Sequence, residues 1–255
     1  TLGYTPSTGF PNAVLPLRWT SIDDYLGCLD SKTRLKFRNS RKLGERFGIE
    51  VDVTGDFEAL APTLEALWNN VNANAKDYSR EQLNSAFFSA SARELAGRSE
   101  IIRFRDGERL IGFMLNLIGA NDYIVLDWGV DYDYRHYREA NLYRAATLIS
   151  LERAIELGKQ RLELGITNYT PKQTLGAEIE PLAYFLKHCH DPRFGRALAT
   201  MLTGSIALPD TTAHAATAKL GTVAHDLAGF ERRVKRDQNP FDAADVLERV
   251  GGFHR

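Results

Sequence analysis

The sequence has little of what marks secreted, metal-binding or membrane-spanning proteins. Only two cysteines, Cys28 and Cys189, occur among 255 residues, and they lie far apart without the spacing of metal ligands. We interpret both as free thiols of a reducing compartment and predict no metal site. No apolar run approaches the roughly 18 residues of a membrane span, and the first residues show no signal-peptide pattern. These absences predict a cytoplasmic protein without a membrane span.

The chain also lacks a large excess of charge of either sign. Lys and Arg number 32 against 33 Asp and Glu, which gives a formal net charge of −1. A protein that covers a nucleic-acid duplex normally carries a strong excess of cations, so only a local basic patch is open to that use. Apolar residues make up 44% of the chain, enough for a real core. The chain starts at Thr1 rather than Met, so we expect a trimmed chain or part of a longer protein.

The spacing of apolar residues predicts strands placed between helices. Strand patterns occur in six segments, at residues 49–53, 100–105, 108–118, 123–130, 162–166 and 182–187. Helical patterns occur in five, at residues 22–26, 31–43, 57–74, 79–96 and 138–157, with Leu35, Leu43 and Phe47 expected to share one face. Ser21 is the predicted N-cap of the first helix and Gly158 the C-cap of the last. We therefore predict an α/β fold with a mixed, mostly antiparallel central sheet flanked by helices.

Composition divides the chain into three predicted parts. Residues 1–16, rich in Gly and Pro, are expected to form an N-terminal arm without a regular element. Residues 17–204 form the main domain. Residues 205–255 form a helical C-terminal extension, in which Thr, Ala and His dominate 211–225 and a basic run at 232–236 is expected to be solvated.

Three segments carry a resemblance to a known family. Residues 31–38 (SKTRLKFR) resemble the helix that opens the catalytic module of Fem-like transferases. Residues 141–158 resemble the long helix that follows the meander in those proteins, and residues 164–176 (LGITNYTPKQTLG) resemble their "G....YK..LG" segment. Over residues 17–190 the chain is similar to the Fem-like, BioF2-like branch (peptidoglycan-bridge-type transferases) of the GNAT acyltransferase superfamily. The resemblance implies a GNAT-like domain at 17–204.

The turn before that long helix lacks a feature of ordinary GNAT enzymes. Their Gly-rich turn lets backbone N–H groups grip the pyrophosphate of CoA, whereas residues 133–140 contain no glycine. We therefore predict no tightly bound cofactor. The resemblance implies acyl-CoA, an acyl-carrier protein or an aminoacyl-tRNA as co-substrate. The side chains of Arg135 and Arg138 are the predicted phosphate ligands in this turn.

Transfer to an amine requires a base, donors for an oxyanion and an acid for the leaving group. In the implied fold the site lies where the last meander strand splays from the next strand. Asp127 is the candidate base, with a solvated or ion-paired carboxylate as the alternative. Lys172 is the candidate anion or oxyanion ligand, or a plain surface lysine. Tyr169 is the candidate acid, or a cover for the sheet edge.

Further residues are predicted to bind the donor or the acceptor. Trp128, His136 and Asn168 are expected to contact substrate, although His136 stands among tyrosines that can simply pack on it. Asn141 either contacts the donor or caps the long helix. The cations Lys32, Arg34 and Arg38 either bind a phosphate-rich donor or form a solvated face.

The leading hypothesis is an acyl- or aminoacyltransferase that acts on a small-molecule amine or peptide by direct transfer, since no Cys or Ser lies in a nucleophile motif. A carrier protein or tRNA is the predicted donor partner. The alternative is a catalytically inactive GNAT-like binding module within a larger biosynthetic protein. A third hypothesis is a nucleic-acid-binding module that uses the basic helix at 32–46.

Overall fold

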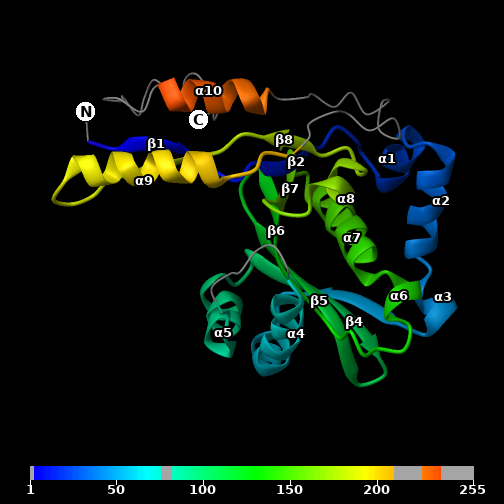
Figure 1. Ribbon diagram of the computed structural model, residues 1–255. Coiled ribbons are helices and arrows are strands. Elements are labelled where there is room, and N and C mark those ends of the chain that lie inside the picture. The colour runs from blue at the N-terminus through cyan, green and yellow to red at the C-terminus, as the bar shows by residue number, and fades with distance from the viewer. Residues whose placement is uncertain (1–2, 76–81, 210–225, 237–255) are drawn as a thin grey trace. The chain divides into compact units, whose positions relative to one another are not determined.

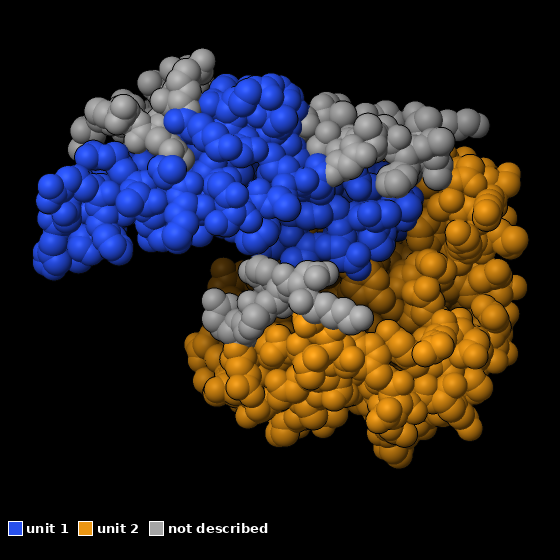
Figure 2. Space-filling view, in the orientation of Figure 1, with its two compact units in different colours: residues 1–14, 166–255 blue, residues 15–165 orange. Residues whose placement is uncertain are grey.

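The structure is a computed structural model that describes residues 3–75, 82–209 and 226–236. Its contacts divide the chain into two compact units, coloured in Figure 2. Unit 1 comprises residues 1–14 and 166–255, and unit 2 comprises residues 15–165. Each unit is described by itself.

Unit 2 is built on the sheet order β3-β4-β5-β6-β7 (Figure 1). The strands are β3 (Glu50–Thr54), β4 (Ser99–Asp106), β5 (Arg109–Ile118), β6 (Asp122–Val130) and β7 (Arg161–Gly165). The first four pair antiparallel in sequence order, and β7 lies parallel to β6. Gly107 takes a left-handed φ of 59° in the turn between β4 and β5, at the predicted hairpin. The predicted meander is confirmed.

Two apolar clusters show that helices cover both faces of this sheet. One cluster joins Ile101 and Phe113 to helices α4 (Ala61–Asn74) and α5 (Ser85–Glu94). The other joins Ile102 and Met114 to helix α7 (Leu142–Glu156). Ile101 and Ile102 are neighbours on β4 and point to opposite faces, as the alternation of a strand requires. The prediction of a mixed, mostly antiparallel sheet flanked by helices is therefore confirmed.

The remaining helices of unit 2 are short. They are α1 (Ile22–Cys28), α2 (Ser31–Ser40), α3 (Leu43–Phe47), the 3₁₀ turn η1 (Glu58–Leu60) and α6 (Tyr137–Ala140). The Ser21 side chain caps α1 by accepting from the Asp24 N–H at 3.1 Å, as predicted. The predicted start of a helix at 79–81 lies outside the described residues.

Two predictions about these helices are wrong in detail. Leu35 does not share a buried face with Leu43 and Phe47, because it is 60% exposed. The buried apolar residue of α2 is Phe37 instead. The helix predicted at 138–157 is not continuous, since Asn141 adopts a left-handed φ of 47° and separates α6 from α7. The predicted end is confirmed: the Gly158 N–H bonds the Ile155 carbonyl and the Lys159 N–H bonds the Ala154 carbonyl, a Schellman motif.

A buried polar network fixes α7 on the sheet. Arg153 of α7 donates two hydrogen bonds to Glu100 of β4, at 3.1 and 3.0 Å. The hydroxyl of Tyr123, at the start of β6, donates to the same carboxylate at 2.7 Å. Burial and this carboxylate raise the pKa of Tyr123, so its hydroxyl stays protonated and keeps donating.

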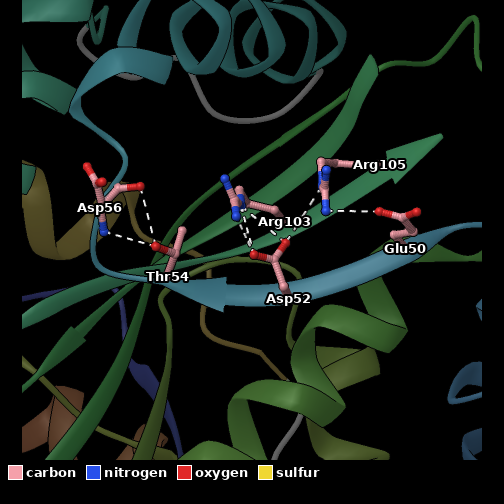
Figure 3. Close-up of polar contacts among 6 residues, drawn as sticks. All are labelled: Glu50, Asp52, Thr54, Asp56, Arg103 and Arg105. Atoms are coloured by element: carbon pink, nitrogen blue, oxygen red, sulfur yellow. Dashed lines mark hydrogen bonds and ion pairs between the residues drawn. The ribbon is translucent and has the colours of Figure 1, made fainter. Parts of the chain in front are cut away.

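The outer strand β3 is bound to β4 by charged pairs (Figure 3). Arg103 forms a two-pronged ion pair with Asp52 on the opposite strand, and Arg105 contacts Glu50 at 2.9 Å. These acids and arginines are cross-strand partners in the register of the sheet. The charges on β3 disfavour pairing of this edge with another strand.

Among its described residues, unit 1 contains two strand pairs and three helices. In the pairs, β1 (Thr5–Thr8) joins β9 (Ala183–Leu186) and β2 (Asn12–Pro16) joins β8 (Glu178–Glu180), both antiparallel. Its helices are α8 (Tyr169–Gln173), α9 (Pro192–Ser205) and α10 (Leu227–Arg236). The prediction that residues 1–16 hold no regular element is wrong, because cross-strand pairing overrides their Gly and Pro content.

The predicted division into arm, transferase domain and extension stays a prediction. The segments 210–225 and 237–255 of the predicted extension lie outside the described residues. In the basic run, Lys235 contacts Glu231 at 2.5 Å and the Arg232 side chain is 74% exposed.

Candidate functional site

Strand β6 has two parts that differ in their pairing. Its first three residues pair with β7, from Asp122 opposite Arg161 to Ile124 opposite Glu163. In the part of the chain that the structure describes, this ladder ends there, while the ladder with β5 continues to Val130. Within unit 2, β6 thus extends beyond its pairing with β7.

A bulge lies in β6 where its ladder with β7 ends. Leu115 of β5 lies opposite Asp127, and the next residue, Asn116, lies opposite Val125, so Leu126 is extra. Val125 and Trp128 pack with the cluster on the α7 face, whereas Leu126 packs with the cluster on the α4 face. A bulge changes where the following side chain points. Here it places Asp127 on the α4 face together with Leu126.

The carboxylate of Asp127 is buried and held by α4. It is 4% exposed, and its Oδ1 accepts a hydrogen bond from Nε1 of Trp68 at 3.0 Å. Asn70 of the same helix donates to the Val130 carbonyl at 3.1 Å. The side chain of Asp127 is therefore not solvated, which was one of its predicted alternatives.

Trp128, the neighbour of Asp127, points to the opposite face. Its ring packs edge-on against Phe104 at 6.2 Å and against Tyr143 at 5.6 Å between ring centroids. Such edge-to-face contacts stabilise a core beyond the area they bury. The structure thus gives Trp128 a packing role on the α7 face.

The segment between β6 and α7 holds four of the predicted site residues. The ring of His136 lies 5.2 Å from that of Phe47 and 5.7 Å from that of Tyr134, so the predicted aromatic packing is present. Arg135 contacts Asp106 at 3.4 Å and is 68% exposed. Arg138 is exposed to solvent.

Asn141 caps α7, which was one of its two predicted roles. Its side-chain oxygen accepts from the Arg144 N–H at 3.3 Å. A side-chain cap uses a backbone donor that an anion would otherwise need at a helix N-terminus. The cap therefore reduces the anion-binding capacity of this turn, as does its lack of glycine.

The cations of α2 divide into two groups. Lys32, Lys36 and Arg38 are exposed on the helix surface. Arg34 instead donates to the carbonyl oxygens of Leu29 at 2.8 Å and Gly27 at 3.3 Å, at the end of α1. The first group is available to an anionic ligand, whereas Arg34 joins two helices.

Asn168, Tyr169 and Lys172 lie together on α8 in unit 1, as the sequence predicted. Asn168 has a left-handed φ of 52° and precedes the helix. The Tyr169 hydroxyl lies 2.8 Å from the Pro11 carbonyl oxygen and 2.5 Å from the Ile166 carbonyl oxygen, which share its single proton. Burial raises the pKa of Tyr169, so this hydroxyl keeps its proton.

Lys172 is not a surface lysine. It is 3% exposed, and burial lowers the pKa of its amine from 10.5 to about 7. Desolvation disfavours the charged form of an amine, which is the cause of this shift. Of the three predicted catalytic residues, Asp127 belongs to unit 2, whereas Tyr169 and Lys172 belong to unit 1.

Sequence reasoning missed Trp68 as a functional candidate. A tryptophan on the apolar side of a helix indicates a core position, and nothing in the sequence announces a carboxylate 59 residues away as its partner. Likewise, no local sequence pattern predicts the bulge at Leu126. Both become visible only through the register of β5 and β6.

The described residues contain no group of three or more His, Cys, Asp and Glu side chains arranged to hold a metal ion. Cys28 and Cys189 are free thiols, as predicted. Within the same residues, no helix combines the length and the apolar character that crossing a bilayer requires.

Comparisons with known proteins show what this chain is similar to. The acetyltransferase (GNAT) domain family matches residues 31–173. A Mycobacterium tuberculosis protein named an 8-amino-7-oxononanoate synthase 2 is 40% identical over 259 residues, which cover all of this chain and 32% of that protein. The chain thus spans about a third of the length of the curated relatives it matches.

Two solved structures are similar in fold. The C-terminal domain of a protein named a lysylphosphatidylglycerol synthetase, from Agrobacterium fabrum, has a TM-score of 0.50 at 13% identity, with 81% of this chain and 69% of that chain covered. FemX has a TM-score of 0.53 at 10% identity, with 80% and 66% covered. At these identities the likeness shows the fold alone.

Proposed function

This chain belongs to the acetyltransferase (GNAT) domain family, and on that premise we propose that it transfers an acyl or aminoacyl group from an activated donor to an amine. The observation that carries the proposal is the arrangement of β6 after Ile124. There the ladder with β7 has ended, and a bulge turns a buried carboxylate toward α4. A strand that leaves its neighbour offers room for an extended donor, and a carboxylate beside it offers a base.

The proposed reaction is a direct transfer. The amine nitrogen attacks the carbonyl carbon of the donor, and a C–N bond forms. The bond from that carbon to the carrier's sulfur or oxygen then breaks. Asp127 takes the proton that the nitrogen loses, and the leaving group takes up a proton as it departs. No covalent enzyme intermediate is required.

For unit 1 considered by itself, Lys172 is the residue proposed to exchange a proton. An amine with a pKa of about 7 exchanges its proton near neutral pH, which suits an acid or base better than a permanent phosphate ligand. Tyr169 is the weaker candidate, because its hydroxyl is engaged with two main-chain oxygens. We propose that Tyr169 chiefly holds α8 in place.

We propose that the acyl group is attached to a phosphate-rich tRNA or to a carrier protein rather than to free CoA. Two observations support this: residues 133–140 contain no glycine, and the Asn141 side chain occupies the cap of α7. Lys32, Lys36 and Arg38 form the proposed electrostatic contact with such a donor. The named product of one fold neighbour, lysylphosphatidylglycerol, carries an aminoacyl group, which makes aminoacyl-tRNA a donor to test.

The proposed acceptor is a small amine or an amino terminus. The M. tuberculosis relative is named for 8-amino-7-oxononanoate, a fatty acid chain that bears a primary amine. We therefore propose amino fatty acids of this kind as the first acceptors to test, beside short peptides.

Intact-mass spectrometry of the acceptor tests the proposal. Each acceptor is incubated with acetyl-CoA, an acyl-carrier protein or aminoacyl-tRNA, with and without the protein. We expect a mass increase of one acyl or aminoacyl group that depends on the protein and falls at least about 100-fold in Asp127→Asn. If no donor gives a product but one of them binds, the chain is a binding module and the proposal is wrong.

A further inference from the structure

We propose that Trp68 is a positioning residue, whose indole N–H fixes the carboxylate of Asp127 in the orientation that accepts a proton. The inference rests on the proposed function of β6. It adds to that function a residue of α4 that does not itself touch the reacting atoms.

The contact between the two side chains is direct and shielded from water. Nε1 of Trp68 lies 3.0 Å from Oδ1 of Asp127, and the two residues are 3% and 4% exposed. An indole N–H can only donate, and the carboxyl oxygen of Asp127 accepts, so the polarity of this bond is fixed. A hydrogen bond in surroundings without water is stronger than one in solvent.

Helix α4 is held close to β6, which leaves Trp68 little freedom to move away. The closest approach is at Gly129, where an added Cβ would lie 2.8 Å from the backbone nitrogen of Trp68 and 2.9 Å from the carbonyl carbon of Leu67. Asn70 bonds the Val130 carbonyl on the same strand. The backbone that carries the indole is therefore set against the strand that carries the carboxylate.

The bulge supplies the other half of the arrangement. In a regular strand Asp127 would point to the same face as Val125, which packs on the α7 side. The extra residue Leu126 turns the carboxylate to the α4 side, where the indole is. Two separate departures from regular packing, the bulge and the glycine, thus lead to one hydrogen bond.

A buried carboxylate costs free energy unless it is satisfied, and an apolar residue of similar size would fill the space without that cost. The acid on the neighbouring turn of α4, Glu65, accepts from the Ser85 N–H at 2.7 Å. The indole N–H donates instead to Asp127.

The test is a double-mutant cycle in the transfer assay, with kcat and KM measured separately for Trp68→Phe, Asp127→Asn and the double variant. We expect Trp68→Phe to lower kcat at least about 10-fold and to leave both KM values within about twofold. In the Asp127→Asn background the same change should cost no further activity, because its effect passes through the carboxylate. Trp19→Phe, on a half-buried ring that contacts Tyr25, is the matched control and should keep wild-type kcat.

A second substitution separates geometry from folding. Replacement of Trp68 by benzothienylalanine keeps the shape of the ring system and replaces its N–H with sulfur, so it serves if Trp68→Phe melts below the assay temperature. The same fall in kcat is expected from it. Near-wild-type kcat in either folded variant, or equal losses from Trp68→Phe with and without Asp127, overturns the inference alone. A wild-type protein that transfers to no acceptor overturns the proposed function and this inference with it.

Discussion

The end of β6 and helix α8 both bury polar side chains, yet they use them in different ways. On β6 the bulge aims the Asp127 carboxylate at the Trp68 side chain, beside the point where the sheet ladder ends. On α8 the Tyr169 hydroxyl is engaged by main-chain oxygens of its own unit. The first arrangement orients a group that can exchange a proton. The second ties together backbone segments that are far apart in sequence.

The comparison shows that buried polar side chains in this molecule have different kinds of partner. Tyr169 was predicted as an acid from its place in a family-like segment, but its partners are those of a structural residue. Lys172 lies on α8 beside Tyr169, but burial lowers the pKa of its amine, so it can exchange a proton near neutral pH. Asp127, in turn, is directed toward α4 by a bulge in β6.

The largest expected effect on stability comes from closing the gap between β6 and α4. In Gly129→Ala the new methyl group would clash with Cε1 of Phe113 and lie within 3 Å of the α4 backbone. We expect the free energy of unfolding to fall by about 3 kcal/mol. Gly27→Ala is the control: it lies in α1 with no atom within 4 Å of the added carbon, so its stability should rise slightly. Urea unfolding of both variants measures the difference, and equal stabilities would refute close packing at Gly129.

The buried amine of Lys172 should make stability depend on pH. In the unfolded chain it keeps its proton up to about pH 10.5, whereas in the folded chain it loses it near pH 7. Between these values the unfolded state binds more protons, so the free energy of unfolding rises with pH, by up to a few kcal/mol. Wild type minus Lys172→Met, measured by denaturant unfolding from pH 6 to pH 10, should show this rise. A flat difference would mean that the amine stays charged in the fold.

A smaller effect should separate structure from catalysis on α8. Tyr169→Phe removes the hydroxyl that binds the carbonyls of Pro11 and Ile166, and we expect a loss of about 1 kcal/mol in stability. Its kcat, measured well below the melting temperature, should stay within about twofold of wild type. A tenfold fall in kcat without loss of stability would instead make Tyr169 the acid that the sequence suggested.

The smallest effect is expected at the surface of α2. Charge reversal by Lys32→Glu and Lys36→Glu should raise the donor KM several-fold and weaken its dependence on salt, because both cations are exposed and available to phosphates. The melting temperature should barely change. Arg232→Glu with Arg233→Glu on α10 is the control and should leave KM unchanged. Equal KM values for both pairs would make α2 a solvated face.

Much of the fold was predictable because it depends on periodicity. The strands of the meander, the cap at Ser21 and the helix end at Gly158 follow from residue patterns within a few positions of each other. The strands β1 and β2 were missed, since they form only by pairing with segments some 170 residues away. The break at Asn141 was missed because an asparagine inside an apolar pattern also fits a continuous helix.

The candidate site was predictable in its residues but not in its geometry. Asp127 and Lys172 were named from their neighbours in sequence, and both are buried. Neither the face to which Asp127 points nor its partner Trp68 follows from local sequence. The bulge depends on how two strands pair. A glycine inside a strand can indicate a close backbone approach, but it does not say which element approaches.

The most direct test of the account is the single-turnover rate of acyl transfer in Asp127→Asn. The amide keeps the size of the side chain and can still accept from Trp68, but it cannot take a proton from the attacking amine. The account predicts a rate at least about 100-fold below wild type, with donor binding and the melting temperature unchanged. A rate within about threefold of wild type would contradict it.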